Sequence, residues 1–241
     1  MNIIAIIQAR MGSSRLPRKV LAGIGGRTML SHVVRRATAA KTLQKVVVAT
    51  SSEPADDVVE AWCQDNGVSF FRGSENDVLD RYYHAAYHYR AEAVTRITSD
   101  CPMIDPEIID RTVSAFLDQR PDYASNTRAR TYPRGLDTEV MTFAALQRAW
   151  SEARNPYQRI HVTPFIYENP EMFSILSVTG ETDYSCYRWT VDTHEDLEFV
   201  RAVYARLGET FSYHDALGLI KREPKLAEIN RFVTQKALHD C

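Results

Sequence analysis

Cationic and small residues gather in one segment near the start of the chain. Residues 2–7 form a short apolar run, typical of a strand that is covered on both faces. The segment 8–19 follows it with four cations and no acid, and it contains Gly12 and Pro17. Backbone N–H groups and cationic side chains beyond the carboxyl end of a parallel strand suit a polyphosphate. We therefore predict a phosphate-binding loop here, with a solvated basic loop as the alternative.

This loop matches none of the common phosphate-binding fingerprints. The chain contains no G-x-x-x-x-G-K-[ST], and residues 23–26 lack the third glycine of G-x-G-x-x-G. A P-loop ATPase and a Rossmann dehydrogenase are therefore disfavoured. The chain also has no Asp-x-Asp triplet, which disfavours a metal-dependent glycosyltransferase of similar architecture.

Two aspartates follow predicted strands. Asp100 comes directly after the strand predicted over 93–98, and Asp192 ends a short strand predicted over 187–192. Carboxylates at strand ends suit Mg²⁺, which prefers hard oxygen ligands and substrate phosphates. The alternative for Asp100 is a turn or a helix cap. Capping of the next helix explains Thr193 and Asp196, but it does not explain Asp192.

The elements that must position these groups alternate between strands and helices. This rhythm implies right-handed crossovers and a mostly parallel sheet, which is an α/β fold. We expect one domain over residues 1–241, since no repeat, linker or domain boundary is visible. The other strands are expected at 45–50, 68–71, 123–126, after the Pro-Arg-Gly turn at 133–135, and at 173–178. Helices are expected after Thr28, at 54–66, through the aromatic residues of 82–89, at 106–119, 143–152 and 156–167, and from 193.

The composition excludes several classes of protein. The chain has 29 basic and 31 acidic residues and a net charge of −2, which gives no general electrostatic case for nucleic-acid binding. No apolar run reaches the length of about 20 residues that a membrane span needs. The short apolar start leads into arginines, unlike a signal peptide. Four cysteines without C-x-x-C pairing fit a reducing cytosol, so we expect a cytoplasmic protein.

Two further segments carry candidate binding residues. In 72–81, backbone groups at Gly73 and Ser74 suit a base or ribose, and Arg81 is placed to reach a phosphate, whereas Asp77 is also explained as a helix-start acid. In 127–140, a Pro-Arg-Gly turn precedes a strand, and we expect it to form the acceptor side of the cleft. The candidates there and in the following helix are Arg134 for a carboxylate, Asp137 and Glu139 for sugar hydroxyls, and His161.

The opening motif resembles that of a known enzyme family. The sequence Ile-Ile-Gln-Ala-Arg-Met-Gly-Ser-Ser-Arg-Leu-Pro-x-Lys-Val-Leu is similar to the signature of the cytidylyltransferases, which include the CMP-Kdo and CMP-sialic acid synthetases. The similarity is greatest to the branch of the spore-coat polysaccharide protein SpsF. Ser-Asp-Cys-Pro at 99–102 and Asp-Thr-x-Glu-Asp-Leu at 192–197 also match the family. Arg18 stands where the family usually has glycine.

The resemblance implies a fold, a reaction and a set of site residues. The fold is a Rossmann-like nucleotidyltransferase fold with a small acceptor and dimerisation lobe at about 127–186, and the assembly is a homodimer. Mg²⁺ would be held by Asp100 and Asp192. The catalytic residues would be Arg10, Lys19, Asp100 and Asp192. The nucleotide would contact Ala9, Arg10, Met11, Gly12, Ser13, Arg15, Lys19, Gly73, Ser74, Asp77 and Arg81.

The reaction expected from this resemblance transfers CMP from CTP to a small anionic acceptor and releases pyrophosphate. An acidic sugar of the 3-deoxy-ulosonate or nonulosonate type suits the arginines around 128–134, and a phosphate or phosphonate acceptor suits them equally. A sugar-1-phosphate nucleotidyltransferase is a further alternative, although those enzymes usually carry a glycine-rich opening loop. The alternative outside enzymes is a non-catalytic nucleotide-binding protein.

Overall fold

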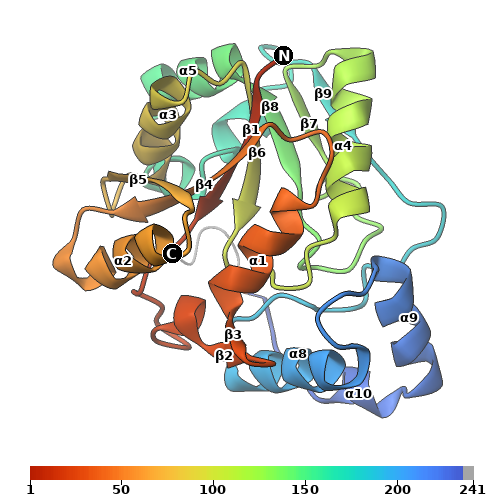
Figure 1. Cartoon of the computed structure of the whole chain (residues 1–241). Coiled ribbons are helices and arrows are strands. Elements are labelled where there is room, and N and C mark those ends of the chain that lie inside the picture. Colours follow the sequence, from red (N-terminus) through yellow and green to blue (C-terminus); the bar gives the residue numbers. More distant parts are fainter. Residues whose placement is uncertain (236–241) are drawn as a thin grey trace.

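A seven-stranded sheet forms the centre of the computed structural model, which describes residues 1–235 (Figure 1). The strand order is β5-β4-β1-β6-β8-β7-β9. β8 is antiparallel to both of its neighbours, and the other pairs are parallel. The strands are β1 (Ile3–Gln8), β4 (Lys45–Ser51), β5 (Ser69–Gly73), β6 (Ala93–Thr98), β7 (Tyr123–Ser125), β8 (Glu139–Thr142) and β9 (Ile175–Ser177). The predicted α/β fold with a mostly parallel sheet is confirmed.

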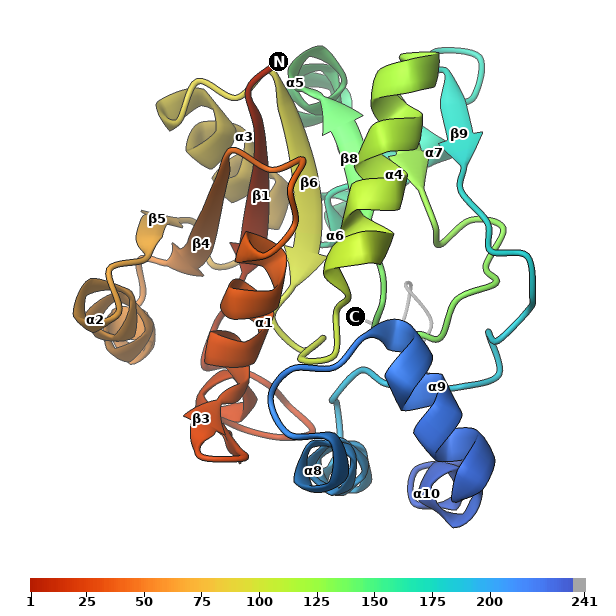
Figure 2. The same ribbon diagram turned by 45° about the vertical axis from the view of Figure 1, so that its right-hand side comes forward.

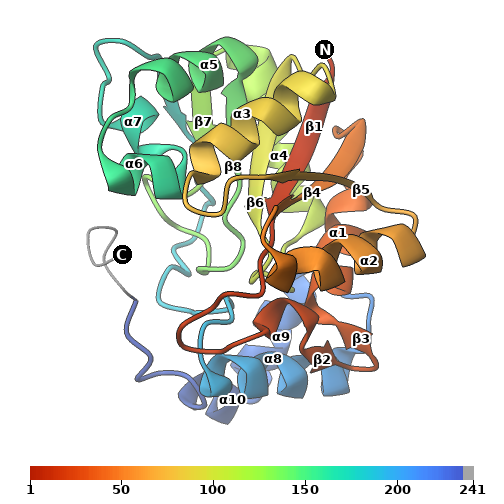
Figure 3. The ribbon, with the colours of Figure 1, turned by 90° about the vertical axis from the view of Figure 1, so that its left-hand side faces the viewer.

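Helices cover both faces of this sheet (Figures 2 and 3). One face packs against α1 (Met29–Thr38), α2 (Asp57–Asp65) and α4 (Pro106–Gln119). The other face packs against α3 (Val78–His88), α5 (Phe143–Glu152) and α7 (Pro164–Tyr167), and α6 (Pro156–His161) contacts α3 and α7. Because β1 is covered on both sides, its first five residues are all buried, which explains its continuous apolar run.

The C-terminal helices lie together beyond the carboxyl ends of β1 and β6 (Figure 1). They are α8 (His194–Leu207), α9 (Tyr213–Arg222) and α10 (Lys225–Glu228). They share a hydrophobic cluster with Leu16 and Trp189 and with Ile24, which lies in the small hairpin of β2 (Gly23–Ile24) and β3 (Arg27–Thr28). This cluster brings the segment after β1 and the segment before α8 to the same edge of the sheet.

The strand order places a topological switch point between β1 and β6. The chain runs outward from β1 to β4 and β5, and it then returns to β6 on the other side of β1. Gln8 of β1 is in register with Thr98 of β6. Ligands of open α/β sheets bind beyond the carboxyl ends of strands at such a point. The predicted phosphate-binding loop and Asp100 leave the sheet here, side by side.

Several helix starts follow the predicted capping residues. The side chain of Thr28 accepts a hydrogen bond from the N–H of Ser31 and begins α1. Thr193 and Asp196 form a reciprocal capping box at the start of α8. A further cap, which was not predicted, is Asp105, whose side chain accepts from N–H groups in the first turn of α4. The predicted bounds of α4 and α5 are confirmed.

Two predicted elements are wrong. The helix expected over 156–167 is broken into α6 and α7, because Val162 has a φ of 74° and Pro164 cannot continue the hydrogen-bonding pattern. The strand expected over 187–192 is extended chain with one isolated bridge between Arg188 and Arg134. Its N–H groups bond instead to two different segments: that of Trp189 to the carbonyl of Arg134 and that of Val191 to the carbonyl of Asp100.

The interval 127–186 contributes β8 and β9 to the central sheet and α5, α6 and α7 to one of its faces. Its loops extend to the carboxyl edge of β6. Cys63, Cys101 and Cys186 are free thiols, and Cys241 lies outside the described residues. Over residues 1–235, no helix combines the length and the apolar character that a transmembrane span requires.

Candidate active site

One ammonium group connects the two aspartates that follow predicted strands. The Nζ of Lys19 donates to Oδ2 of Asp100 at 2.9 Å, to Oδ1 of Asp192 at 2.8 Å and to the carbonyl of Val191 at 2.9 Å. The three charged side chains are between 12% and 24% exposed, so they are shielded but open to solvent on one side. Lys19 begins the 3-10 helix η1 (Lys19–Leu21). The structure thus brings Lys19, Asp100 and Asp192 to one point at the switch between β1 and β6.

The loop 9–18 is fixed by backbone hydrogen bonds and by one buried carboxylate. Oδ1 of Asp56 accepts from the N–H of Met11 at 2.6 Å, and Asp56 is 2% exposed. Asp56 ends the 3-10 helix η2 (Pro54–Asp56), which follows β4. The carbonyl of Met11 accepts from the N–H groups of Ser13 and Arg18. Two of the amides expected at the phosphates, those of Met11 and Ser13, are therefore used within the protein.

Arg18 adopts a left-handed conformation, with φ 61° and ψ 17°. A residue with a Cβ is strained by roughly 1 kcal/mol there, whereas glycine is not. This conformation turns the chain into η1 and so places Lys19. It gives a physical reason for glycine at this position in the resembling family.

Asp192 receives two further cations. Oδ2 of Asp192 lies 2.9 Å from Nη2 of Arg15 and accepts from Nη2 of Arg188 at 2.7 Å. Arg188 also donates to Asp196, the capping residue of α8. The site is therefore rich in cations, and Arg15 and Lys19 both come from the segment that we predict to bind phosphate.

These contacts shift the pKa values of Lys19 and Asp100 in opposite directions. Burial alone would lower the pKa of Lys19, but the charges of Asp100 and Asp192 outweigh it and raise the pKa above its ordinary value. Burial alone would raise the pKa of Asp100, but Lys19 and hydrogen bonds from neighbouring groups outweigh it and lower the pKa. Both side chains are therefore charged at neutral pH.

The two carboxylates fit a metal ion that arrives with a phosphate ligand. Their bonds to one ammonium show that they can share a single cation. Within residues 1–235, no group of three or more His, Cys, Asp or Glu side chains is placed to hold a metal ion by itself. Mg²⁺ commonly takes one or two carboxylates and fills its other positions with substrate phosphates and water. The donor set thus suits Mg²⁺ bound together with a nucleotide.

The predicted nucleotide segment 73–81 lies next to the phosphate-binding loop, but its charged side chains are occupied. Arg10, 46% exposed at its side chain, lies 3.8 Å from Glu75. Arg81 is only 1% exposed and donates to the carbonyl of Ser74, so it supports the segment from beneath instead of reaching out to a phosphate. Asp77 caps α3 and pairs with Arg159 of α6. A Cβ added at Gly73 would lie 3.1 Å from the Cγ of Arg81, so the backbone of Gly73 packs closely against this side chain.

The predicted acceptor residues divide into two groups. Arg130 forms a two-pronged ion pair with Asp137, with N–O distances of 2.6 and 2.9 Å. Arg134 is half-buried, and within residues 1–235 no acidic side chain lies within ion-pairing distance of it. Burial, together with the charges of Arg130 and Arg188, lowers the pKa of Arg134. Within residues 1–235, Arg134 is therefore a half-buried cation of this loop without an ion-pair partner, whereas the exposed Arg128 lies over the ring of Tyr167.

Glu139 and His161 lie on the side of the sheet that α3, α5 and α7 cover. Glu139 is 5% exposed, and its carboxylate is held by Arg96, Tyr123 and Thr163. These contacts leave it as a buried structural acid, in contrast to its predicted role at sugar hydroxyls. His161 is the last residue of α6 and is half-buried. The structure does not bring either residue to Lys19.

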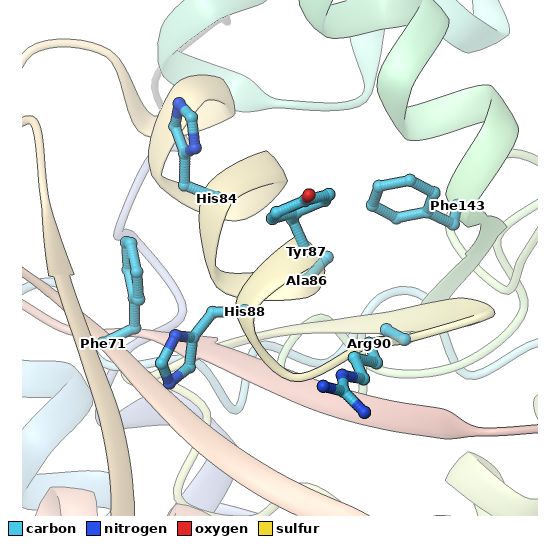
Figure 4. Close-up of a pocket in the computed structure, with 8 residues that line it drawn as sticks. Phe71, His84, Ala86, Tyr87, His88, Arg90 and Phe143 are labelled. Atoms are coloured by element: carbon cyan, nitrogen blue, oxygen red, sulfur yellow. The ribbon is translucent and has the colours of Figure 1, made fainter.

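A separate hollow of about 680 Å³ lies beside the C-terminal half of α3 (Figure 4). Its position near Ala91 is at the amino end of β6, whereas Lys19 and Asp100 lie at the carboxyl end. The lining residues point to different sides of α3, so they do not converge on a ligand (Figure 4). They are Phe71, His84, Ala86, Tyr87, His88, Arg90, Ala91 and Phe143.

Comparison with known proteins places the chain in a family. Residues 4–236 match the family described as cytidylyltransferase. A solved cytidylyltransferase from Leptospira borgpetersenii is 39% identical, with a TM-score of 0.91 over 98% of this chain and 100% of that one. The spore coat polysaccharide biosynthesis protein SpsF of Bacillus subtilis is 35% identical over 94% of this chain and 97% of its own length. A 3-deoxy-manno-octulosonate cytidylyltransferase of Brucella ovis is 38% identical, over 52% of this chain and 50% of its own length.

The fold and these matches identify the protein as a nucleotidyltransferase. The chain belongs to the cytidylyltransferase family, and the sequence resemblance to this family is confirmed. Arg188, Asp56 and Asn230 carry no motif that marked them in the sequence. Their contacts join positions from 4 to 47 residues apart, and the fold brings these positions together.

Proposed function

We propose that this enzyme transfers CMP from CTP to an acidic sugar of the 3-deoxy-ulosonate or nonulosonate type, with Mg²⁺ as cofactor. The observation that carries the proposal is the convergence of Lys19 on both Asp100 and Asp192 at the switch point of the sheet. A triphosphate at this edge meets cations from the loop after β1 and two carboxylates that can share its metal ion. The curated relatives in polysaccharide and Kdo metabolism support an acidic sugar as the acceptor.

In the reaction, an acceptor hydroxyl oxygen attacks the α-phosphorus of CTP. The new bond joins that oxygen to phosphorus, the bond from phosphorus to the bridging oxygen breaks, and pyrophosphate leaves with the electron pair. The hydroxyl proton passes to solvent. Bound Mg²⁺ would polarise the α-phosphate and neutralise charge on the triphosphate. Such a reaction depends chiefly on in-line positioning and electrostatic stabilisation.

Different residues of this chain would bind the phosphates and the metal ion. Arg10 is exposed at the mouth of the loop, and with Arg15 and Lys19 it would hold the β- and γ-phosphates and the leaving pyrophosphate. Asp100 and Asp192 would hold the metal ion. Arg15 and Lys19 would therefore move from the carboxylates to phosphate oxygens when the nucleotide binds.

The environment of Arg134 supports the proposal that the acceptor is an anion. A half-buried guanidinium without a counter-charge is costly unless an anion reaches it, and its planar fork matches a carboxylate. Arg134 lies on the segment whose backbone pairs with residues 187–189, so it is close to Asp192 in the fold. A phosphate or phosphonate acceptor would satisfy the same cation. Assembly as a homodimer and a cytoplasmic location remain predictions.

The proposal is tested by pyrophosphate release from purified protein with CTP, UTP or GTP and Mg²⁺. Each nucleotide is combined with a panel of acidic sugars, phosphonates and sugar 1-phosphates. We expect release with CTP and an acidic sugar, and loss by a factor of about 100 or more in Asp100→Asn. Release only with a phosphonate, or only with UTP or GTP and a sugar 1-phosphate, would contradict the proposed acceptor or nucleotide. Unchanged turnover of Asp100→Asn would contradict the metal assignment.

A further inference from the structure

Arg188 connects Asp192 to the buried start of α8. Its Nη2 donates to Oδ2 of Asp192 at 2.7 Å and to Oδ2 of Asp196 at 3.1 Å, and its Nε donates to Oδ1 of Asp196 at 2.9 Å. The side chain of Asp196 is fully buried, and that of Arg188 is 10% exposed. The guanidinium thus holds a fixed carboxylate with Nε and Nη2, and the same Nη2 also reaches the carboxylate that faces the site.

The same framework also fixes the backbone around Asp192. Oδ2 of Asp196 accepts from the N–H groups of Asp192 and Thr193 at 2.9 and 3.1 Å. The side-chain nitrogen Nδ2 of Asn230 donates to Oδ1 of Asp196 and to the carbonyl of Arg188, both at 2.9 Å. Asp196 therefore fixes Asp192 in two ways. It accepts a hydrogen bond from the main chain of Asp192, and it holds the side chain of Asp192 through Arg188.

The three cationic side chains that contact Asp192 differ in their other binding partners. Lys19 and Arg15 belong to the segment that we propose to bind phosphate, so a triphosphate competes for them. Arg188 keeps its bonds to Asp196 and also donates from Nη1 to the side chain of Gln235 at 2.5 Å. When Lys19 and Arg15 turn to a nucleotide, Arg188 remains to orient Asp192.

We propose that Arg188 is a positioning residue that holds the carboxylate of Asp192 toward Asp100 and the metal–triphosphate. The inference rests on the proposed function, in which Asp192 binds the metal ion. Groups that orient a metal ligand typically contribute about 10–100-fold to metal affinity. Arg188 acts through Asp192 and contacts neither the metal nor the nucleotide.

The test is the effect of Mg²⁺ on CTP binding, measured by isothermal titration calorimetry with and without the metal. The ratio of the two dissociation constants is the magnesium enhancement. In Arg188→Lys the positive charge remains, but a single nitrogen cannot serve Asp192 and Asp196 with the geometry of a fork. We expect the enhancement to fall by about tenfold or more. CTP affinity without metal should change by less than about twofold, since the charge is retained.

Two further variants separate positioning from a general structural effect. Asp192→Asn should lose the enhancement, and adding Arg188→Lys to it should cause no further loss, because both act on one interaction. Arg35→Lys is the control for the change from arginine to lysine. Arg35 forms a more exposed ion pair with Glu209, with side chains 38% and 37% exposed, and it also donates to the carbonyl of Glu209 at 2.8 Å. It should keep the wild-type enhancement.

The outcomes distinguish this inference from the proposed function. Wild-type enhancement in a folded Arg188→Lys, or losses that multiply in the double variant, would overturn the role of Arg188 alone. Equal CTP affinity of the wild type with and without Mg²⁺ would overturn the proposed function as well. Thermal melting checks the fold of each variant. If Arg188→Lys does not fold, Asn230→Ala removes one support of Arg188, and retention of the full enhancement there would equally overturn the inference.

Discussion

The Nζ of Lys19 lies 2.8 Å from Oδ1 of Asp192, although 173 positions separate the two residues in the sequence. The same nitrogen lies 2.9 Å from Oδ2 of Asp100. In the protein without nucleotide, Lys19 is thus the cation that the two carboxylates share. A metal ion and this ammonium satisfy the same charge requirement, so removing one should make the other more important.

Replacement of Lys19 by methionine tests this relationship. Removing one member of a fully buried ion pair costs about 3–5 kcal/mol, and we expect less, about 2 kcal/mol, because these side chains retain some solvent contact. Asp100 would then lose the cation that pairs with it, whereas Asp192 would keep Arg15 and Arg188. Added Mg²⁺ should therefore raise the melting temperature of Lys19→Met by linkage, with little effect on the wild type. Lys45→Met, at an exposed lysine, is the control, and an equal response of both variants would contradict the prediction.

The lowered pKa of Asp100 predicts a loss of stability in acid. A group whose pKa is lower in the folded than in the unfolded protein stabilises the fold above its unfolded value, about 3.9 for aspartate. This stabilisation is lost as the pH falls through the lower, folded-state pKa. The free energy of unfolding of the wild type should therefore fall more steeply below about pH 4 than that of Asp100→Asn. Urea titrations at several pH values measure it, and Asp118→Asn controls for net charge. Parallel curves would contradict it.

Gly135 should not tolerate a side chain. Its φ is 110°, and an added Cβ would lie 2.6 Å from the backbone nitrogen of Thr190 and 2.6 Å from the carbonyl carbon of Trp189. Gly135→Ala must displace the segment that carries Asp192. We expect a loss of at least about 2 kcal/mol of stability and of most activity. Gly26→Ala is the matched control: φ is 87° but nothing lies within 4 Å, so only the backbone strain remains. Similar losses in both variants would show that the close contact is unimportant.

Arg18→Gly should stabilise the protein. The left-handed backbone at Arg18 strains a residue with a Cβ, and glycine removes that strain at the cost of a more flexible unfolded chain. The net gain should be about 0.5 kcal/mol in urea unfolding. The same substitution at Arg222, in the last turn of α9, should instead cost up to about 1 kcal/mol. Destabilisation by Arg18→Gly would indicate that its side chain makes a contribution beyond the turn.

Arg134→Gln should weaken binding of the acceptor. Loss of a charged hydrogen bond costs about 1.5–3 kcal/mol, so KM for an acidic acceptor should rise by about tenfold or more. KM for CTP should stay close to the wild-type value. Steady-state kinetics by pyrophosphate release measure both constants. Arg154→Gln, beyond α5, is the control. A rise in KM for CTP alone would place Arg134 at the nucleotide.

Most of the fold was predictable because its signals are local. The buried run of β1, the cap at Thr28 and the capping box at Thr193 each depend on residues within a few positions. The break at Val162 was missed because a β-branched residue rarely adopts a positive φ. The segment 187–192 was wrongly predicted as a strand. Its sequence did not show that its backbone hydrogen bonds go to two separate segments instead of one neighbouring strand.

The site was predictable only in part. Strand ends indicated the loop 9–18, Asp100 and Asp192, and parallel strands place their carboxyl ends at one edge. Charge alone did not show that Arg81 and Glu139 are buried. Arg81 bonds to a backbone carbonyl of its own segment, and the partners of Glu139 come from elsewhere in the fold. Asp56 was missed since its acceptor role toward the N–H of Met11 involves a backbone group that no sequence pattern marks.

The support of Arg188 by Asn230 has a consequence for synthesis of the protein. Lys19 is translated long before Asn230, so a growing chain presents the basic loop before it has the framework of Asp192. A ribosome-bound chain that stops short of Asn230 would lack this support for the catalytic edge. The framework of Asp192 would therefore be complete only after Asn230 has been synthesised.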